Sequence, residues 1–436
     1  MLLRDLAYAA AAVVSAPIWA TRMLRTGKHR TDWAGRFGHI AARPKSEIRN
    51  AISLSPAPSP SPSPPPALLI HAVSVGEVNA IRGLVAGLAA ARPDVRVVIC
   101  STTDTGHARA TQLFGERHEV VRYPLDFSFA VRRFLDGVRP DVVALTELEL
   151  WPNFVSACRR RGIAVCVVNG RLSDRSFKRY RLARPLLRGT FASLDAAAVQ
   201  TPVYAERFRQ MGTPADRVRV LDSMKWDNAS IADEVPGADE LAAAMGIDRS
   251  RPLIAAGSTG PGEEAMLINT CPREAQLLVA PRRPERFDEV TRLVPGVVRR
   301  TAHADGTHRE PAVEQRFFLL DTLGELRKAY ALADVCVVGR SFLGLYGSDP
   351  TEPIALGKPT VIGPHHADFA DMVTALADAG GLIVTDEPGA TAATLLADRA
   401  RADGLAERGR ATIRQRQGAT QRHVELLLSL LPEPTR

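Results

Sequence analysis

The chain has 436 residues, of which 45% are hydrophobic and 24% are charged. This balance excludes an intrinsically disordered protein, and the length exceeds what one hydrophobic core usually organises, so we expect two domains. The formal net charge of +8 predicts an anionic partner, but no basic block is rich in aromatic residues, which argues against nucleic acid.

The N-terminal segment, residues 1–42, contains an apolar run over residues 6–20 that is followed by Arg22, Arg25, Lys28, His29 and Arg30. The run is shorter than the roughly 20 residues that a spanning helix needs. We predict a helix that lies in or dips into a membrane, with its cations on phospholipid phosphates. A signal-peptide core and a buried helix of the first domain remain as alternatives. Residues 43–66 are rich in Pro and Ser and form a predicted extended linker.

Beyond the linker, apolar runs typical of buried strands alternate with helical patterns, which predicts parallel, doubly wound sheets. In the first domain, residues 67–222, the predicted strands are 67–73, 95–101, 120–123, 142–146, 163–168, 196–200 and 218–221. Residues 223–251 form a predicted connector. In the second domain, residues 252–436, the predicted strands are 253–256, 276–280, 317–320, 335–339, 360–362 and 382–384. The end of this domain is predicted to be helical, and its last helix either stays with the second domain or packs back on the first domain.

Neither half carries the glycine fingerprint of a dinucleotide-binding domain, and a P-loop is also absent. For two consecutive Rossmann-like halves, the remaining common architecture is that of GT-B glycosyltransferases, in which the carboxyl edges of two sheets face a central cleft. The five cysteines are scattered, and several fall in predicted strands, so we expect buried, reduced thiols in a cytosolic protein. No Cys/His cluster has the spacing of metal ligands, and we expect neither a metal nor a cofactor.

Polar residues follow several of these strands, at the sheet edge where α/β proteins place their ligands. Glu77 follows the first strand and Gly76, before a helix predicted over residues 78–91. A carboxylate at this place is also a favourable charge for the helix dipole, and both interpretations remain open. The remaining candidates of the first domain follow two further strands: Glu147, Glu149, Asn169, Arg171 and Ser176.

In the second domain, Ser258 and Thr259 end a strand, and Glu263 opens the next helix. Backbone N–H groups at such a helix start can bind a phosphate without a metal. Arg282 and Arg283 end the following strand and are the best cations for an anionic ligand, with a solvated basic rim as the alternative.

In this order and spacing, a set of short strings resembles the Kdo transferases of lipopolysaccharide synthesis. The strings are HAVSVGE at 71–77, ELELWPN at 147–153, NGRLSDRS at 169–176, GST at 257–259, GEE at 262–264, PRRPERF at 281–287 and EPIALGKP at 352–359. The resemblance implies a GT-B enzyme that moves 3-deoxy-D-manno-octulosonic acid (Kdo) from CMP-Kdo to a lipid A precursor, lipid IVA. It also implies that the protein is located at the cytoplasmic face of the inner membrane.

The resemblance further implies roles for single residues. Glu77 would be the general base for the acceptor hydroxyl, with Glu147 or Glu149 assisting. The implied acceptor-binding residues are Ser74, Gly76, Asn169, Arg171 and Ser176. The implied donor-binding residues are Lys225, Ser258, Thr259, Glu263, Arg282, Arg283, Ser348, Asp349 and Glu352, with Glu352 on the nucleotide ribose.

Three strings depart from the family pattern, at residues 222–225, 281–284 and 347–350. Asp349 stands beside a predicted phosphate site, so we expect it to face a hydroxyl or a base, or to be held by Arg340. Two other functions remain as alternatives: a GT-B transferase or epimerase that uses another nucleotide sugar, and a membrane-tethered binding protein without catalysis.

Overall fold

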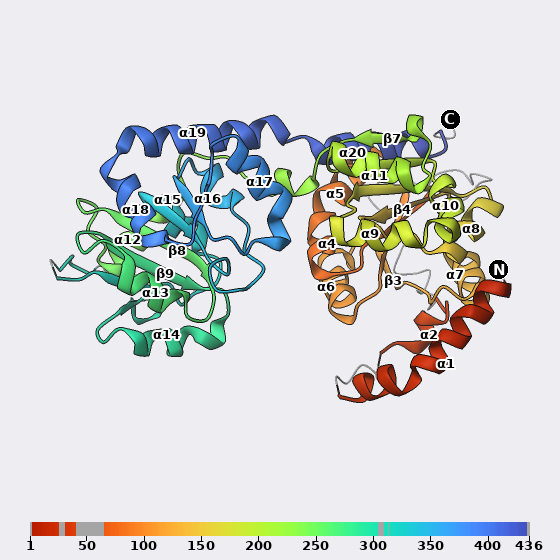
Figure 1. Ribbon diagram of the computed structural model, residues 1–436, viewed down its shortest axis with the longest axis horizontal. Helices are drawn as coiled ribbons and strands as arrows, with labels where there is room; N and C mark the ends of the chain where they lie inside the picture. The colour runs from red at the N-terminus through yellow and green to blue at the C-terminus, as the bar shows by residue number, and fades with distance from the viewer. Residues whose placement is uncertain (1, 26–30, 41–64, 304–308, 313, 434–436) are drawn as a thin grey trace, which may run out of the picture. The chain divides into compact units, whose positions relative to one another are not determined.

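The computed structural model describes residues 2–25, 31–40, 65–303, 309–312 and 314–433 (Figure 1). These residues form two compact units. Unit 1 comprises Met1–Asp227 together with Gly418–Arg436, and unit 2 comprises Asn228–Gln417. Most of the Pro/Ser-rich linker predicted over residues 43–66 lies outside the described residues.

Unit 1 is built on a parallel sheet of seven strands in the order β3-β2-β1-β4-β5-β6-β7. Its strands are β1 (Ala67–His71), β2 (Arg96–Ser101), β3 (Glu119–Arg122), β4 (Val142–Thr146), β5 (Ala164–Gly170), β6 (Ala196–Val199) and β7 (Val218–Val220). Its helices after the N-terminal segment are α4 (Val75–Ala80), α5 (Arg82–Ala91), α6 (Asp104–Phe114), α7 (Ser128–Val138), α8 (Pro152–Arg160), α9 (Asp174–Leu182), α10 (Arg184–Ala192), α11 (Pro202–Met211) and α20 (Ala419–Leu430).

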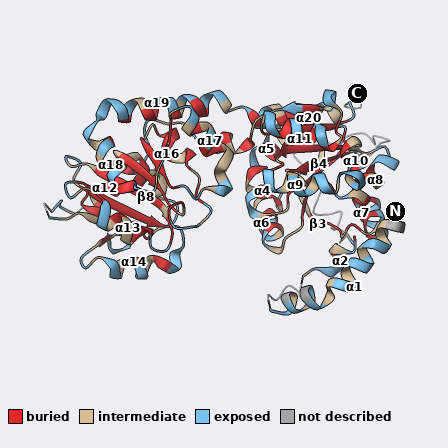
Figure 2. Ribbon diagram, in the orientation of Figure 1, coloured by how far each residue is buried: buried red, intermediate tan, exposed pale blue. Residues whose placement is uncertain are grey.

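The two faces of this sheet carry separate hydrophobic cores, because successive strand side chains point to opposite sides. Leu69 belongs to the core under α7, α8 and α11, whereas Leu68 and Ile70 belong to the core under α4, α5 and α20. Figure 2 shows the resulting pattern, with buried strands between helices whose outer sides are exposed. A strand covered on both faces needs an unbroken apolar run, and β1 has one.

Unit 2 repeats the architecture with strand order β10-β11-β9-β8-β12-β13-β14, again all parallel. Its strands are β8 (Leu253–Thr259), β9 (Gln276–Pro281), β10 (Val298–Arg299), β11 (Phe317–Leu319), β12 (Val335–Val338), β13 (Thr360–Ile362) and β14 (Ile383–Val384). Its helices are α12 (Ala238–Met245), α13 (Glu263–Thr270), α14 (Phe287–Leu293), α15 (Leu326–Leu332), α16 (Thr351–Ala355), α17 (Ala370–Asp378), α18 (Pro388–Ala397) and α19 (Arg399–Arg416). The prediction of two parallel α/β sheets is confirmed.

The unit boundaries lie at different residues from the predicted domain boundaries. Most of the predicted connector, from residue 228 to residue 251, belongs to unit 2, where Leu241 and Met245 of α12 pack in a core with Leu253. At the other end of the chain, Val424 and Leu427 of α20 pack in a core of unit 1 with Leu68. The last helix therefore completes unit 1.

The N-terminal helix α1 (Leu2–Arg25) is held to unit 1 by its first two turns. Tyr8 donates a hydrogen bond to Asp126 (2.9 Å), and Asp5 accepts one from the Asn153 side chain (2.9 Å). None of the described side chains of α1 is buried, and Val14 is 82% exposed, so the alternative of a buried helix is wrong. Within the described residues, no helix combines the length and the apolar character needed to cross a membrane.

Candidate active site

In unit 1, the predicted residues come together because β1, β4 and β5 are neighbours in the sheet. Glu77 follows β1, Glu147 and Glu149 follow β4, and Arg171 follows β5. Parallel strands end at one edge, so these four side chains reach the same place. They line one pocket of about 280 Å³ with Leu148, Ser173, Ser176 and Tyr180.

Glu77 lies in the first turn of α4 and closes that turn with Ser74. The Glu77 carboxylate accepts hydrogen bonds from the Ser74 hydroxyl (2.9 Å) and from the Val73 N–H (3.0 Å), while Ser74 accepts from the Glu77 N–H (3.4 Å). This reciprocal arrangement resembles a capping box. Glu77 therefore does stabilise the start of α4, as one of the two interpretations predicted. A carboxylate offers about four acceptor positions, so two remain for a ligand.

The pKa of Glu77 is raised to about 7, mainly by burial; the hydrogen bonds from Val73 and Ser74 oppose the rise, and the charges of Glu147 and Glu149 contribute to it. A carboxyl group with a pKa near the working pH is a stronger base than an ordinary carboxylate and is still largely available for proton transfer. Burial also raises the pKa of Glu149, which accepts a hydrogen bond from the Trp151 ring N–H (2.9 Å). The pocket thus concentrates acidic groups that repel one another.

Neither Glu147 nor Glu149 caps the following helix. The N-cap of α8 is Trp151, and no side chain makes a cap hydrogen bond there. Glu147 instead occupies the left-handed backbone region, with φ of 60°. Strain of this kind in a non-glycine residue is typical of functional sites.

Ser173 and Tyr180 were not among the predicted site residues. Ser173 is the N-cap of α9 and donates a hydrogen bond to the Ser176 hydroxyl (3.2 Å). A sequence signal for Tyr180 exists, because residues four apart lie on the same helix face and Tyr180 stands four residues after Ser176. Burial raises the pKa of the Tyr180 hydroxyl, so this hydroxyl remains a hydrogen-bond donor.

The prediction that Asn169 binds the acceptor is wrong. The side chain is buried, and its Oδ1 accepts a hydrogen bond from the Met224 N–H (3.1 Å). Its own backbone N–H donates to Nε2 of His423 on α20 (3.0 Å). Asn169 therefore fastens the end of β5 to later parts of unit 1.

Gly76 is exposed on α4, and a Cβ added to it would have only the Ser74 hydroxyl within 4 Å, at 3.8 Å. We expect Gly76→Ala to leave the free energy of unfolding within about 0.5 kcal/mol of the parent value, since the protein itself has room for the methyl group. The resemblance implies that Gly76 lets the acceptor come close, and on that prediction the acceptor KM should rise severalfold while the donor KM stays constant. An unchanged acceptor KM would contradict close approach at Gly76.

In unit 2, two predicted donor ligands prove to be internal. Glu263 is fully buried, and its carboxylate accepts hydrogen bonds from the N–H groups of Gly260 (2.8 Å), Arg340 (2.6 Å), Ser341 (2.8 Å) and Phe342 (3.0 Å). The Glu263 side chain therefore holds the loops after β8 and β12, and its assignment to the donor is wrong.

Thr259 is also buried, and its hydroxyl donates to Glu264 (2.7 Å), so its side chain is not a donor ligand either. Glu264 is fully buried and forms a bidentate ion pair with Arg286, at 2.6 and 2.9 Å. This pair links the starts of α13 and α14 beneath the sheet edge. It gives Glu264 of the string GEE and Arg286 of the string PRRPERF a structural role.

The exposed cations at this edge are Arg282 and Arg283, which follow β9. Neither guanidinium forms an ion pair with the residues that the structure describes, and both remain available to an anion. Ser258, partly exposed at the end of β8, has a left-handed backbone with φ of 55°. These three residues remain candidates for the donor.

The predicted donor-binding residues around α16 differ in whether their side chains could contact a ligand. Asp349 accepts hydrogen bonds from the N–H (2.9 Å) and the hydroxyl (2.6 Å) of Thr351, the first residue of α16, and is not held by Arg340. The Ser348 hydroxyl is buried and has no hydrogen-bond partner within the described part of the chain. Glu352 is partly buried, and burial raises its pKa, with Arg327 opposing the rise. Lys225, on η3 (Met224–Asn228), belongs to unit 1.

The five cysteine side chains are buried, as predicted. Among the described residues, no group of three or more His, Cys, Asp or Glu side chains is arranged to hold a metal ion.

Comparisons with known proteins agree with one another. A family model described as 3-deoxy-D-manno-octulosonic-acid transferase (kdotransferase) matches residues 31–228. The chain is 35% identical over 376 residues to a 3-deoxy-D-manno-octulosonic acid transferase of Bordetella pertussis, covering 82% of this chain and 86% of that one. It is 29% identical over 374 residues to the enzyme of that name from Haemophilus influenzae, covering 83% and 86%.

Among solved structures, the chain is similar to Acinetobacter baumannii MurG, with a TM-score of 0.52, 17% identity, and coverage of 84% of this chain and 100% of that chain. At this identity the likeness shows the fold alone. It confirms the GT-B class predicted from the two successive Rossmann-like halves.

Proposed function

Since the chain belongs to the 3-deoxy-D-manno-octulosonic acid transferase family and is thus a glycosyltransferase, we propose that it moves Kdo from CMP-Kdo to a lipid A precursor, lipid IVA. The observation that carries the proposal is the acidic pocket of unit 1, in which Glu77 combines a pKa near 7 with unused acceptor positions. A sugar hydroxyl has a pKa far above 7 and reacts only when a positioned base removes its proton.

In the proposed reaction, Glu77 takes the proton of the acceptor hydroxyl while the hydroxyl oxygen attacks the anomeric carbon of Kdo. The bond between that carbon and the CMP phosphate oxygen breaks, and the electron pair leaves with CMP. A single displacement of this kind inverts the anomeric configuration. Glu147 and Glu149 orient the acceptor in this scheme and keep the pKa of Glu77 high.

Arg171 is the cation of the acidic pocket and is the proposed ligand of an acidic group on the acceptor. A guanidinium binds carboxylates and phosphates through two parallel hydrogen bonds. Ser176 and Tyr180 supply hydroxyl groups beside it. The pocket therefore offers both a base for the reacting hydroxyl and a positive group for an anionic lipid.

On the donor side, Arg282 and Arg283 are proposed to bind the CMP phosphate and to stabilise the charge on the leaving group. Glu352 is proposed to accept hydrogen bonds from the ribose hydroxyls, which a partly buried carboxylate does well. Ser258 and Ser348 complete the proposed pocket, and Lys225 remains a candidate for the same phosphate. These assignments need no metal ion or cofactor.

We further propose that α1 associates with phospholipid at the cytoplasmic face of the inner membrane. Val13 and Val14 on this helix are 74% and 82% exposed, and Leu24 is 67% exposed. Arg25 follows at the end of the helix, where it can approach a lipid phosphate. An acceptor that is itself a membrane lipid makes such a location useful.

The test is a transfer assay with the full chain, CMP-Kdo and lipid IVA in detergent, followed by mass analysis of the lipid. We expect lipid products that are heavier by one or more Kdo residues. Uridine-linked sugars in place of CMP-Kdo should give no product. Transfer from a uridine sugar alone would favour another GT-B activity, and CMP-Kdo binding without turnover would favour a binding protein.

A further inference from the structure

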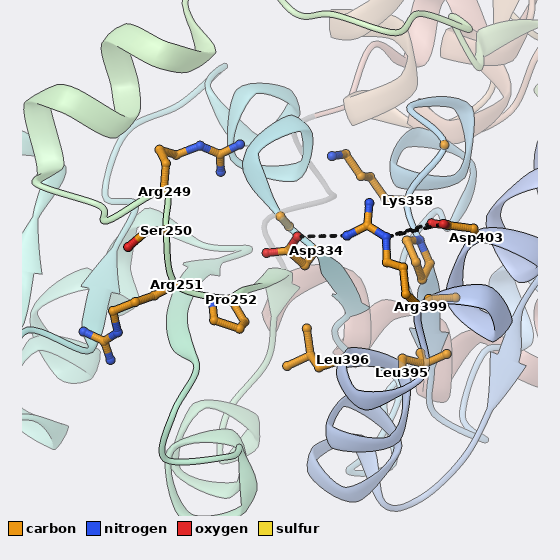
Figure 3. A pocket seen from close by; sticks show the side chains of 14 residues that line it. Arg249, Ser250, Arg251, Pro252, Asp334, Lys358, Leu395, Leu396, Arg399 and Asp403 are labelled. Carbon is orange, nitrogen blue, oxygen red and sulfur yellow. Dashed lines mark hydrogen bonds and ion pairs between the residues drawn. The ribbon is translucent and has the colours of Figure 1, made fainter.

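A second pocket in unit 2 lies at the sheet edge opposite to the proposed donor residues. It has a volume of about 270 Å³ and borders the amino ends of β8, β12 and β13 (Figure 3). Because all strands of this sheet are parallel, the residues that follow the strands lie at the other edge. No predicted site residue lines this pocket, although Lys358 belongs to the family string EPIALGKP.

The pocket contains more positive than negative charge. Its basic residues are Arg249, Arg251, Lys358 and Arg399, and its acidic residues are Asp334 and Asp403. Both carboxylates are already engaged. Arg399 pairs with Asp403 (3.1 Å) and with Asp334 (3.8 Å), and Asp334 also accepts a hydrogen bond from the Leu253 N–H (2.9 Å).

Lys358 and Arg249 form no ion pair with a carboxylate among the residues that the structure describes, although the Arg249 guanidinium also donates a hydrogen bond to the Leu332 carbonyl oxygen (2.5 Å). Figure 3 shows their charged ends extending toward each other from opposite walls, whereas the guanidinium of Arg251 points away. Burial lowers the pKa of Lys358, Cys336 and Asp334 oppose this effect, and the charges of Arg249 and Arg399 add a smaller lowering effect. An anion bound between two positive charges reduces the electrostatic repulsion between them.

The remaining walls are apolar, with Leu395, Leu396, Pro252 and Pro359 beside the cations. We propose that this pocket binds a small phosphate-bearing anion, with the phosphate between Lys358 and Arg249 and the rest of the molecule against Leu395 and Leu396. The site is separate from the proposed transfer reaction, and its occupancy does not depend on that reaction.

The test uses a lysine-acylating reagent on the full chain, with and without inorganic pyrophosphate, and locates the labelled residues by mass spectrometry. Labelling of Lys358 should fall about tenfold when pyrophosphate is about ten times its dissociation constant. Lys178, whose side chain is 77% exposed, should label equally in both samples. Lys225 reports separately on any binding at the proposed donor residues. Sodium chloride at equal ionic strength controls for screening.

Matched variants then test the geometry. Arg249→Gln should abolish the protection of Lys358, and Arg251→Gln should preserve it, since only Arg249 extends toward Lys358. If Lys358 resists the reagent, the broadening of the pyrophosphate signal in phosphorus NMR gives the same comparison in a chain that also carries Arg282→Gln and Arg283→Gln. Equal labelling with and without pyrophosphate, protection reproduced by sodium chloride, or equal behaviour of the two variants would overturn the proposal.

Discussion

Replacing Glu77 by Gln is expected to lower kcat for Kdo transfer by a factor of about 10² to 10⁴, the usual contribution of a general base. Gln can retain the capping arrangement with Ser74, so the helix start should remain intact. The matched control is Ser74→Ala, which removes the cap but keeps the base. It should cost about 1 kcal/mol of stability and lower kcat far less than Glu77→Gln does, while a rise in the acceptor KM would report the acceptor contact predicted for Ser74. Normal transfer by a folded Glu77→Gln protein would refute the role of Glu77.

The pH dependence gives a second measure of the same group. Because the pKa of folded Glu77 is about 7, kcat should rise with pH up to about that value and then level off. The folded pKa is above the ordinary value of 4.5, so the folded state binds more protons than the unfolded state between these values. This contribution to stability is present below about pH 4.5 and is lost as the pH rises through about 7. Glu77→Gln should lack this loss, as urea unfolding at pH 5 and pH 8 would reveal.

Replacing Arg286 by Met is expected to destabilise unit 2 by about 3–5 kcal/mol, because it leaves the carboxylate of Glu264 buried and unpaired. The change also removes the two hydrogen bonds between these side chains. The measurement is the shift of the urea unfolding midpoint of the full chain. Arg292→Met, at an exposed position of α14, the helix that Arg286 precedes, is the matched control and should change stability by less than about 0.5 kcal/mol.

The double variant Glu264→Gln with Arg286→Met should recover part of the lost stability, since an uncharged amide is less costly to bury than an unpaired carboxylate. An effect of Arg286→Met no larger than that of Arg292→Met would show that the buried pair contributes little.

The fold was predictable because buried parallel strands leave a strong local signal. Runs such as residues 67–73 and 142–146 coincide with β1 and β4. The strand β10 was missed, since its two residues carry no periodicity, whereas the equally short β14 lies within the strand predicted over residues 382–384. The helix predicted over residues 78–91 is divided at Ile81 into α4 and α5, and α4 already begins at Val75. The helix α12 was not predicted within the connector. Its apolar residues pack against the core of unit 2, a contact that the local sequence does not reveal.

The candidate site was predictable in position but not in orientation. A residue that follows a strand must lie at the sheet edge, and Glu77, Glu147, Glu149 and Arg171 meet there. The direction of a side chain depends on distant partners that the local sequence does not reveal. Asn169 turns inward because its partners are Met224 and His423.

Glu263 also turns inward, because its partners lie beyond β12, more than 70 residues later in the chain. The GEE string around it suggested a ligand site, and a carboxylate at the start of a helix has the same local signature whether it faces a ligand or a neighbouring loop. The separation between Glu263 and the loop that it holds explains why the sequence alone left this orientation open.

The position of α20 has a consequence for the order in which the chain folds during synthesis. All strands of unit 1 precede unit 2 in the chain and are synthesised first, yet one face of the unit 1 sheet lacks Val424 and Leu427 until α20 has been made. Until α20 has been made, the backbone N–H of Asn169 also lacks its hydrogen-bond acceptor, Nε2 of His423. Unit 2 is contiguous in sequence and can complete its own core first. The half of the molecule that begins synthesis is therefore the half that matures last.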